Sequence, residues 1–288
     1  MSRTRPPFEL IQHDLLIQNL IPLPLIDLLP QGWKRIGHVG ILTLDPRLYP
    51  WKRVIGQVYL KHLPELSTIA HKVGITTQET RTPDYEVLAG DPKTITLHKE
   101  LHCTFILDAL RLTFSSGNHA ERLHLIHACQ PDEKVIDMFA CVGNLSIPLA
   151  VHIPTAKVLG IDINPLACTY LAKNIQKNHL TDRYYAVCGD NRIATPVDWA
   201  DRVIMGYFTL DSAHFISALS SLRQTRGGTI HAHGLSSNRN PQDWYQNVNN
   251  IISGSFPHFK ISTTKKRIIK TVAAGIEHFV DDITIVPQ

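Results

Sequence analysis

From residue 134 onward, the chain alternates short apolar runs with amphipathic segments. The strand-like runs are residues 135–139, 158–162, 184–188, 202–205 and 228–233. The helical patterns are residues 144–151, 166–178, 213–222 and 241–253. Regular alternation of strands and helices predicts an α/β fold with a doubly wound parallel sheet. A short connection separates two last runs, residues 259–267 and 277–286, so we expect these two strands to be antiparallel.

The first strand of this series and the residues after it predict a ligand-binding turn. Residues 134–150 read KVIDMFACVGNLSIPLA, and we expect the strand to end over residues 137–139. Four mostly small residues then allow a tight turn, and Asn144 is a candidate helix cap. A strand, a tight turn and a helix N-terminus form a cradle for a nucleotide-like ligand. This pattern alone is common among α/β proteins, so the ends of the neighbouring strands decide its meaning.

Three successive predicted strands end in acidic residues, Asp137, Asp162 and Asp190. Because parallel strands end at one edge of a sheet, we expect the three carboxylates to surround one crevice. Asp162 is placed to accept both hydroxyls of a ribose, Asp190 the amino group of adenine, and Asp137 the amino group of an amino-acid tail. The turn is too short for a dinucleotide-binding loop and no P-loop is present, which favours S-adenosylmethionine over NAD or ATP. The alternative interpretation is three ordinary cap and turn aspartates.

Around these residues the chain resembles a known family. The segments that carry the likeness are residues 137–148, 161–165, 171–174 with 178, 189–192 and 201–205. The likeness extends through residues 81–86, 114–115 with 121–122, 230–233, and 266–275 with 278. They resemble the tRNA enzymes of the class I methyltransferase fold that modify the purine just 3′ of the anticodon. This family contains the tRNA guanine-N1 methyltransferases and the wybutosine-synthesising aminocarboxypropyltransferases. The resemblance implies a Rossmann-like catalytic domain over residues 111–288 that binds S-adenosylmethionine and acts on tRNA.

Two short segments separate the branches of this family. The methyltransferases carry Asn-Leu-Pro after the fourth strand, where this chain has Gly206-Tyr207-Phe208, a sequence similar to the aminocarboxypropyltransferases. Residues 231–233 also resemble the His-Tyr-His of the latter, with Ala232 as a departure. Cys141 stands where the family usually has glycine, which is tolerable if the backbone φ there is ordinary. The resemblance therefore implies transfer of the 3-amino-3-carboxypropyl group of S-adenosylmethionine to a tricyclic wybutosine precursor next to the anticodon of tRNA-Phe, with release of methylthioadenosine.

The resemblance also implies roles for single residues. Glu121 is the candidate catalytic base, with a helix-surface charge as the alternative interpretation. The candidate cofactor-binding residues are Ser115, Asp137, Phe139, Ala140, Gly143, Asp162, Ile163, Asp190, Asn191 and Gly206. The candidate substrate-binding residues are Arg81, Arg122, Tyr207, His233 and Lys266. Tyr207 or Phe208 would stack on the extruded base, as aromatic side chains do in RNA-binding proteins.

Residues 1–110 have a different pattern, and we expect a smaller N-terminal α+β domain that binds tRNA. The predicted elements are helices over residues 9–20, 25–29 and 50–63, a strand over 39–44, and a hairpin of 94–97 with 103–107 that turns at Lys99-Glu100. The net charge of +4 is compatible with a polyanionic partner without requiring one. The candidate phosphate contacts are Lys52, Arg53, residues 265–267 and Lys270.

The cysteines and the N-terminus bear on location. The five cysteines are an odd number and include no Cys-x-x-Cys pair, which favours free thiols in a reducing compartment. The N-terminus has no signal-peptide pattern, and polar residues and prolines interrupt the apolar segment 15–29. We therefore expect a cytoplasmic monomer. We expect no metal site, because His231 and His233 have no further ligands at convincing spacing.

Three alternatives remain open at this point. A tRNA guanine-N1 methyltransferase would use the same cofactor site, and Gly206 argues against it. A second alternative is a non-catalytic module that binds S-adenosylmethionine and RNA. The presence of Glu121 together with Asp137, Asp162 and Asp190 argues against it. A methyltransferase for small molecules would leave residues 1–110 without a role.

Overall fold

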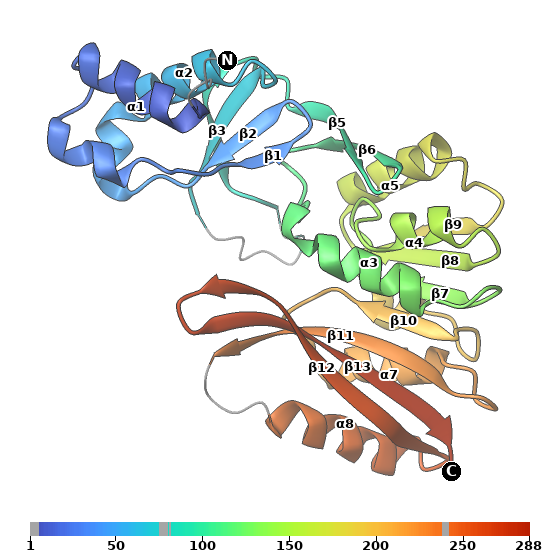
Figure 1. The fold of residues 1–288 in the computed structure, drawn as a ribbon. Helices are drawn as coiled ribbons and strands as arrows, with labels where there is room; N and C mark the ends of the chain where they lie inside the picture. The colour runs from blue at the N-terminus through green and yellow to red at the C-terminus, as the bar shows by residue number, and fades with distance from the viewer. Residues whose placement is uncertain (1–5, 75–79, 81, 238–241) are drawn as a thin grey trace, which may run out of the picture. The chain divides into compact units, whose positions relative to one another are not determined.

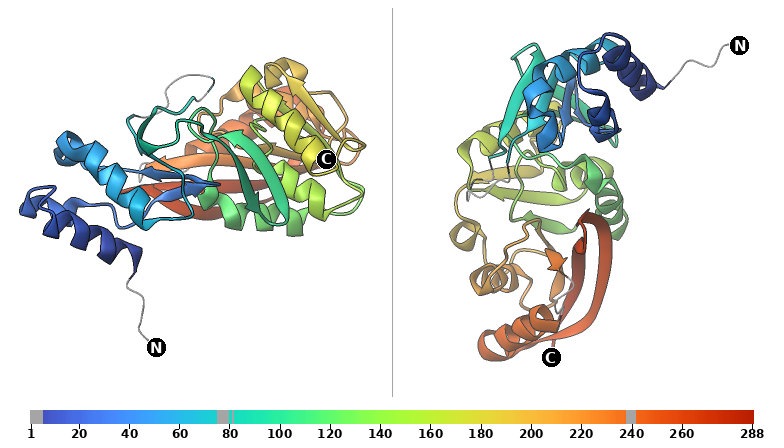
Figure 2. Two further views of the ribbon diagram at one scale, coloured as in Figure 1. Left: turned by 90° about the horizontal axis from the view of Figure 1, so that it is seen from above. Right: turned by 90° about the vertical axis from the view of Figure 1, so that its left-hand side faces the viewer.

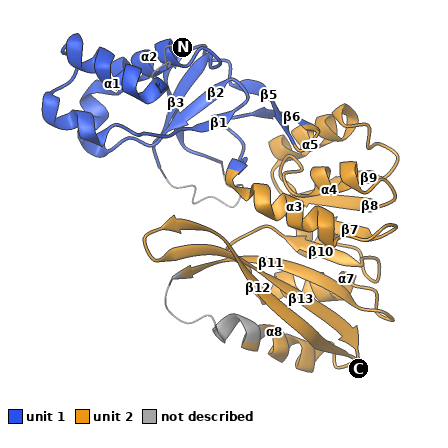
Figure 3. Cartoon of the chain, viewed as in Figure 1, with its two compact units in different colours: residues 1–100, 104–116 blue, residues 101–103, 117–288 orange. Residues whose placement is uncertain are grey.

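The computed structural model describes residues 6–74, 80, 82–237 and 242–288, and it divides the chain into two compact units (Figures 1 and 3). Unit 1 comprises residues 1–100 and 104–116, and unit 2 comprises residues 101–103 and 117–288. The predicted boundary after residue 110 falls within the 104–116 segment of unit 1.

Unit 1 is built on a four-stranded sheet of order β1-β2-β3-β4, in which β2 and β3 are parallel and the other neighbours antiparallel. Its helices are α1 (Pro7–Ile17), η1 (Leu23–Leu28), η2 (Pro46–Trp51) and α2 (Lys52–His62). The strands are β1 (Lys34–Ile36), β2 (Val39–Leu42), β3 (Thr68–Lys72) and β4 (Tyr85–Gly90), followed by the two-stranded sheet of β5 (Ile95–Glu100) and β6 (Cys103–Asp108). Helix α2 forms the crossover between β2 and β3, as a parallel pair requires.

The core of unit 1 lies between its helices and its larger sheet. Ile55, Val58 and Tyr59 recur at helical spacing on α2 and are buried, together with Ile11 and Leu15 of α1. The sequence pattern does not predict β1, β3 or β4. Strand β3 is short and has four buried residues in a row without alternation, so its pairing with β2 and β4 determines its conformation more than its own pattern does.

The hairpin of β5 and β6 turns two residues later than predicted. Leu101 and His102 occupy the turn with φ of 49° and 59°, whereas Lys99 and Glu100 belong to β5. Two successive positive φ angles are what a two-residue hairpin turn needs to match the twist of its strands. Neither residue is glycine or asparagine, so the usual sequence signal for this turn is missing.

Helix η3 (Ser116–Asn118) spans the chain boundary between the two units, and unit 2 continues with α3 (His119–Ala128) and a strand–helix alternation. Its strands are β7 (Lys134–Asp137), β8 (Lys157–Asp162), β9 (Tyr184–Cys188), β10 (Arg202–Met205), β11 (Gly228–Ser237), β12 (Phe259–Ala273) and β13 (Ile276–Pro287). Its remaining helices are α4 (Ser146–His152), α5 (Pro165–Lys177), α6 (Asn191–Ala194), α7 (Ser212–Ser221) and α8 (Gln242–Ser255). The predicted α/β class and every strand predicted after residue 134 are confirmed.

The seven strands of unit 2 form one sheet of order β12-β13-β11-β10-β7-β8-β9. Strands β7 to β11 run parallel to one another. Strand β13 is antiparallel to β11, and β12 and β13 are antiparallel to each other, as predicted. The chain runs outward from β7 to β9 and then returns to β10 on the other side of β7. The order of strands therefore reverses between β7 and β10, where α/β sheets bind their ligands.

Helices cover both faces of this sheet (Figure 1). Apolar side chains of α7 and α8, including Phe215, Leu219 and Ile252, pack in one buried cluster with Val203 and Ile283 of the sheet. Helices α4 and α5 belong to the crossovers on the other side of the reversal, so right-handed connections place them on the opposite face.

Strands β12 and β13 form a hairpin that is longer than predicted, and Figure 2 shows it as a long curved ribbon. The β-branched residues Ile268, Ile269 and Val272 extend β12 past the predicted end at Arg267. Its pairing is interrupted by register shifts near residues 261–263, 268–270 and 271–273, and such bulges increase strand twist.

Candidate active site

The turn after β7 has the tight geometry expected of a ligand cradle. Ala140 N donates to Ile161 O at 2.9 Å, which ties the turn to β8. Gly143 has φ of 89°, and a Cβ there would lie 2.4 Å from Cδ1 of Ile147, so only glycine fits. The predicted cap is wrong: α4 begins two residues after Asn144, and its N-cap is Leu145 without a side-chain hydrogen bond.

Cys141 does not have the ordinary backbone angle that would make it a simple replacement for glycine. Its φ is 49°, in the left-handed region that glycine favours. Its N–H donates to Asp162 Oδ2 at 2.7 Å, so the strained residue connects the turn directly to the acid at the end of β8. The departure from the family pattern therefore has a conformational cost.

Asp137 lies beneath this turn rather than on its surface. The residue is 1% exposed, and its two oxygens accept hydrogen bonds from Phe139 N at 3.2 Å and from Ser146 Oγ at 2.6 Å. Ser146 Oγ is also 2.7 Å from the hydroxyl of buried Tyr184. Burial raises the pKa of Asp137 to about 6, although the hydrogen bonds from Ser146 and Phe139 oppose the shift. In this structure its carboxylate holds the turn and the start of α4.

Asp162 lies at the carboxyl end of β8, beside the turn. Its Oδ1 accepts from Asn164 N at 2.9 Å and its Oδ2 from Cys141 N. Carboxylate oxygens are acceptors of the kind that a pair of ribose hydroxyls requires. Ile163 next to it is 38% exposed, as a side chain that packs on a ligand would be. The side chain of Asn164 caps α5 by accepting hydrogen bonds from Leu166 N and Ala167 N.

Asp190 and Asn191 follow β9. The carboxylate of Asp190 accepts from Arg192 Nε and Nη2 at 2.6–3.1 Å, and this side-chain pairing lowers its pKa. Asn191 donates through Nδ2 to Met138 O at 2.7 Å, below the β7 turn. Its buried Oδ1 has no hydrogen-bond partner among the described residues, so an acceptor is left for a ligand donor.

Aromatic side chains lie at the end of β10. The ring of Tyr207 stacks on Phe139 with centroids 4.9 Å apart and an interplanar angle of 13°. His214 of α7 packs against both rings, with centroids 5.4 Å from Phe139 and 6.3 Å from Tyr207. A Cβ on Gly206 would lie 3.3 Å from Leu145, a close contact with the residue that begins α4. Residues 206 and 207 are therefore next to the β7 turn, at the reversal of the sheet.

Glu121 is a buried carboxylate rather than a surface charge. It belongs to the first turn of α3, its side chain is 0% exposed, and Arg267 of β12 donates to both its oxygens at 2.5 and 3.2 Å. Burial raises the pKa of Glu121, and the hydrogen bonds from Arg267 offset part of this effect. The next residue, Arg122, is also buried and donates through Nε to Asn144 O at 2.7 Å, which supports the β7 turn.

A buried network extends from Glu121 across the sheet. Asp282 of β13 accepts from Arg267 Nε and Nη2 at 2.6 and 2.8 Å and lies 2.6 Å from His231 Nδ1. His231 Nε2 is 2.6 Å from Arg202, which pairs with Glu133 at 2.7 Å. Burial alone would raise the pKa of Asp282, but hydrogen bonds from Arg267 and His231 outweigh it and lower that pKa..

Arg267, Asp282 and Arg202 are members of the site that were not predicted from the sequence. The signal in the sequence was the spacing of polar residues along two strands. Residues 278 and 282 are four apart on β13, and His231 and His233 are two apart on β11. Each pair therefore lies on one face of the sheet. Lys266, which was predicted to bind substrate, is exposed and lies over the ring of Phe279 at 4.1 Å.

Three side chains of this network, His124, His231 and Asp282, have ligand atoms within 4.8 Å of one another. Two guanidinium groups compete with a cation there. Arg267 donates to both oxygens of Asp282, and Arg202 is hydrogen-bonded to Nε2 of His231. A metal ion would have to displace both arginines, so the geometry favours an ion-pair network.

Two predicted site residues are not placed at this site. Arg81 lies outside the described residues, and Ser115 belongs to unit 1. His233, predicted to bind substrate, is buried, with Nδ1 3.0 Å from His278 Nε2. The ring of His278 packs edge-on against Phe208, with centroids 4.8 Å apart, so these histidines reach the segment that follows β10.

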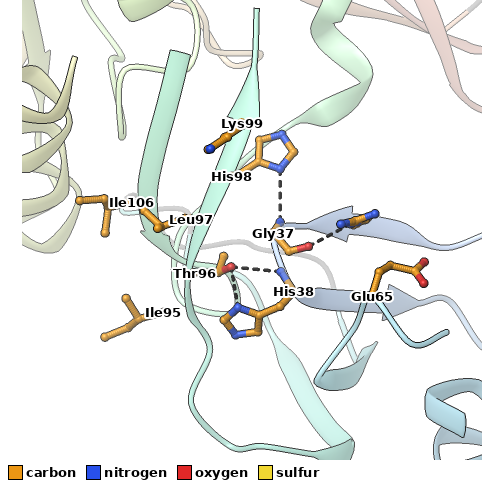
Figure 4. A pocket seen from close by; sticks show the side chains of 10 residues that line it. Gly37, His38, Glu65, Ile95, Thr96, Leu97, His98, Lys99 and Ile106 are labelled. Carbon is orange, nitrogen blue, oxygen red and sulfur yellow. Dashed lines mark hydrogen bonds between the residues drawn. The ribbon is translucent and has the colours of Figure 1, made fainter. Parts of the chain in front are cut away.

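Unit 1 contains a cleft of about 850 Å³ beside β5 (Figure 4). The exposed cations Arg35 and Lys99 line it, and Ile95 and Leu97 add apolar side chains that are 57% and 53% exposed. His38 lies on its wall and is held by Thr96 Oγ1. Lys52 and Arg53, by contrast, are paired with Glu86.

The residues around the β7 turn fit S-adenosylmethionine. The glycine-dependent turn allows close backbone approach, Asp162 offers acceptors beside it, and Asn191 Oδ1 is a buried acceptor without a described partner. None of the five cysteines, all of which lie in the described part of the chain, forms a disulfide. Among the described residues, no helix combines the length and apolar character needed to cross a membrane.

Comparisons with known proteins show the family to which the chain is similar. A family model described as TRM5/TYW2 methyltransferase domain matches residues 96–261, and one described as TYW2 N-terminal domain matches residues 13–94. The tRNA(Phe) (4-demethylwyosine(37)-C(7)) aminocarboxypropyltransferase of Pyrococcus horikoshii is 35% identical over 271 residues, which cover 94% of this chain and 95% of that protein.

Two solved structures extend the likeness to the whole chain. The structure of P. horikoshii TYW2 in complex with MeSAdo has a TM-score of 0.81 at 32% identity and covers 98% of this chain and 100% of that one. WT Trm5b from Pyrococcus abyssi has a TM-score of 0.83 at 26% identity and covers 99% of this chain and 82% of that one. The chain belongs to the TRM5/TYW2 methyltransferase-domain family.

Proposed function

We propose that this protein is an S-adenosylmethionine-dependent tRNA aminocarboxypropyltransferase. It transfers the 3-amino-3-carboxypropyl group to a tricyclic wybutosine precursor next to the anticodon of tRNA-Phe and releases methylthioadenosine. The observation that carries the proposal is full-length similarity, at 35% identity, to a protein named for this reaction, together with a TYW2 N-terminal domain match. Gly206-Tyr207 in place of Asn-Leu-Pro supports the same branch.

Different residues of the chain bind different parts of S-adenosylmethionine. Asp162 accepts the ribose hydroxyls, and Asp190 and Asn191 accept the adenine amino group. Phe139, Ala140, Gly143 and Ile163 shape the turn around the ligand, with Asp137 fixing that turn from below. When bound, S-adenosylmethionine supplies an electrophilic γ-carbon on a positively charged sulfur.

The acceptor base is bound at the end of β10. Gly206 leaves room there, and Tyr207 provides a ring face that is already ordered by stacking on Phe139. Glu121 takes the proton that the acceptor carbon loses, and its raised pKa suits a base at neutral pH. Arg122 and His233 support this pocket. Positioning supplies most of the rate enhancement.

Unit 1 binds tRNA through its cleft. Arg35 and Lys99 contact phosphates, while Ile95 and Leu97 pack on an unpaired base. Lys266 adds a cation from unit 2. The protein works as a monomer in the cytoplasm, in line with its free thiols.

One incubation tests this function. The protein is mixed with S-adenosylmethionine and tRNA-Phe that carries 4-demethylwyosine, and the modified nucleoside is weighed by mass spectrometry. The proposal requires a gain equal to one aminocarboxypropyl group. A methyl gain on tRNA with unmodified guanine would instead identify the guanine-N1 methyltransferase branch.

A further inference from the structure

Glu121 and His233 face each other across a gap in the buried network. Oε1 of Glu121 lies 3.8 Å from Nε2 of His233, and the side chains are 0% and 2% exposed. Nε2 of His233 has no hydrogen-bond partner among the described residues. Buried polar atoms are nearly always paired, so this open position calls for a physical reason.

The hydrogen bonds around the gap indicate where the protons lie. Arg267 donates two hydrogen bonds to Glu121, as it would to an ionised carboxylate. An Nε2–H that faced this carboxylate would form a charge-assisted hydrogen bond of about 2.8 Å. The observed 3.8 Å is the separation of two acceptors, so Nε2 of His233 carries a lone pair. Its proton is then on Nδ1, which donates to Nε2 of His278 at 3.0 Å.

The surroundings keep His233 neutral. Charged and titratable groups face it from every neighbouring element: Glu121 of α3, Arg267 of β12, His278 and Asp282 of β13, and His231 of its own strand. Burial lowers the pKa of His233 well below the usual value, and His278, His231 and Arg267 lower it further. A proton that reaches this imidazole is therefore passed on rather than held.

We propose that His233 is a positioning residue that receives, through Glu121, the proton released by the acceptor base. The inference rests on the proposed function. As the acceptor carbon forms its new C–C bond, the methylthioadenosine leaving group takes the electron pair of the broken C–S bond. The acceptor's C–H bond then breaks, its electrons return to the ring, and the proton goes to Glu121. It fills the gap as an O–H···Nε2 hydrogen bond.

A second shift regenerates the base. The proton moves from Glu121 to Nε2 of His233 while the Nδ1 proton of His233 moves to Nε2 of His278. Glu121 is then ionised again beside Arg267, and the positive charge is on His278, next to Phe208. No oxidant, reductant or metal is needed, and the number of protons is conserved.

The first test needs no substrate. Long-range ¹⁵N NMR of the histidine rings distinguishes the two neutral tautomers, and His233→Gln assigns the signals of residue 233. We expect the Nδ1–H tautomer in the free protein. An Nε2–H tautomer would overturn the proposal. His71→Gln serves as the matched control, because His71 is a buried histidine of unit 1 and its loss should leave the His233 signals in place.

The second test uses single-turnover rates over a range of pH. His233→Phe keeps a ring but offers no acceptor, so we expect a rate loss of roughly 100-fold. In His233→Phe, protonated Glu121 also loses its hydrogen bond to residue 233, which lowers the pKa of Glu121. We therefore expect the ascending limb of the pH–rate profile to move to lower pH. His233→Gln keeps an acceptor oxygen that cannot relay a proton, and it should restore the position of the limb but not the rate. Wild-type rates in His233→Phe would refute the relay.

Two further measurements separate possible failures. Methylthioadenosine affinity should stay within about twofold of wild type in each variant, because these residues do not contact the cofactor turn. If His233→Phe does not fold, His278→Gln tests the same path, and it too should reduce the rate. If the wild-type protein transfers no aminocarboxypropyl group at all, the proposed function fails, whereas a fully active His233→Phe enzyme contradicts only the relay.

Discussion

At the scale of single residues, the cofactor turn combines one glycine that the backbone requires with one cysteine that it does not favour. Gly143 and Cys141 both have positive φ. A Cβ at position 143 would clash with its neighbours, whereas Cys141 carries a Cβ at a conformational cost. Cys141 is nevertheless tied to Asp162 through its N–H. The turn therefore keeps its conformation through hydrogen bonds that are made by the backbone.

Cys141→Gly should stabilise the protein. Glycine adopts a φ of 49° without strain, so we expect the free energy of unfolding to rise by about 1 kcal/mol. Urea denaturation measures it. Cys188→Gly is the control: this exposed cysteine lies in strand β9, where glycine should destabilise by about 0.5–1 kcal/mol. Equal losses in the two variants would show that residue 141 is not strained.

Asp137 should make stability depend on pH in an unusual direction. Its pKa is raised to about 6 in the folded protein from an ordinary value of 3.8, so the folded state binds the proton more tightly. The stabilisation of the folded state by protonated Asp137 is therefore fully present below about pH 4 and is lost as the pH rises through about 6. Relative to wild type, Asp137→Asn should gain up to about 3 kcal/mol between about pH 4 and pH 7. A pH-independent difference, measured by urea denaturation, would contradict the shift.

At the scale of elements, the long β12–β13 hairpin completes the site that α3 begins. It brings Arg267, His278 and Asp282 to Glu121, which is 146 residues from Arg267 along the chain. Cross-strand neighbours hold these groups, since His231 of β11 pairs directly with Asp282 of β13. A buried carboxylate at position 121 is therefore stable only while the hairpin supplies its guanidinium partner.

Arg267→Gln tests this dependence. It leaves two carboxylates, Glu121 and Asp282, without their charged partner, so we expect a loss of about 3 kcal/mol or more in the free energy of unfolding. Lys266→Gln, one residue away but exposed, should cost less than about 1 kcal/mol. Chemical denaturation compares the two variants, and similar losses would mean that the hairpin's charge does not support Glu121.

The sequence predicted the elements of unit 2 well because strand and helix periodicity are local signals. The acids at the ends of β7, β8 and β9 could be placed together because parallel strands share an edge. The partners of Glu121 could not, since they depend on the register of β12 and β13, which no local pattern specifies. In unit 1, β3 and β4 were missed because tertiary pairing overrides their weak propensity.

At the scale of the whole molecule, the two units place their charged side chains differently. Unit 2 buries one network of ionic groups around Glu121 and Asp282, whereas the cleft of unit 1 presents Arg35 and Lys99 to solvent beside exposed apolar side chains. Exposed cations next to apolar surface suit a nucleic-acid strand with an unpaired base. The division of labour between tRNA binding and chemistry is therefore testable in separate variants.

Reversing charge in the cleft should weaken tRNA binding without affecting the cofactor. For Arg35→Glu and Lys99→Glu, we expect tRNA affinity to fall and the slope of log affinity against log salt to decrease by about 1 per lost phosphate contact. Lys61→Gln is the control, because its ammonium is already bound to Asp14. Filter binding over a salt series measures both quantities. An unchanged slope in the cleft variants would exclude phosphate contacts there.

The transferred group is the central claim, and the nucleoside by-product reports it most directly. Wild-type protein is incubated with S-adenosylmethionine and tRNA-Phe that carries 4-demethylwyosine, and the released nucleoside is quantified by chromatography and mass spectrometry. We expect methylthioadenosine, equal in amount to the modified tRNA and absent without that precursor. Release of S-adenosylhomocysteine in its place would contradict the account and assign the protein to the methyltransferases.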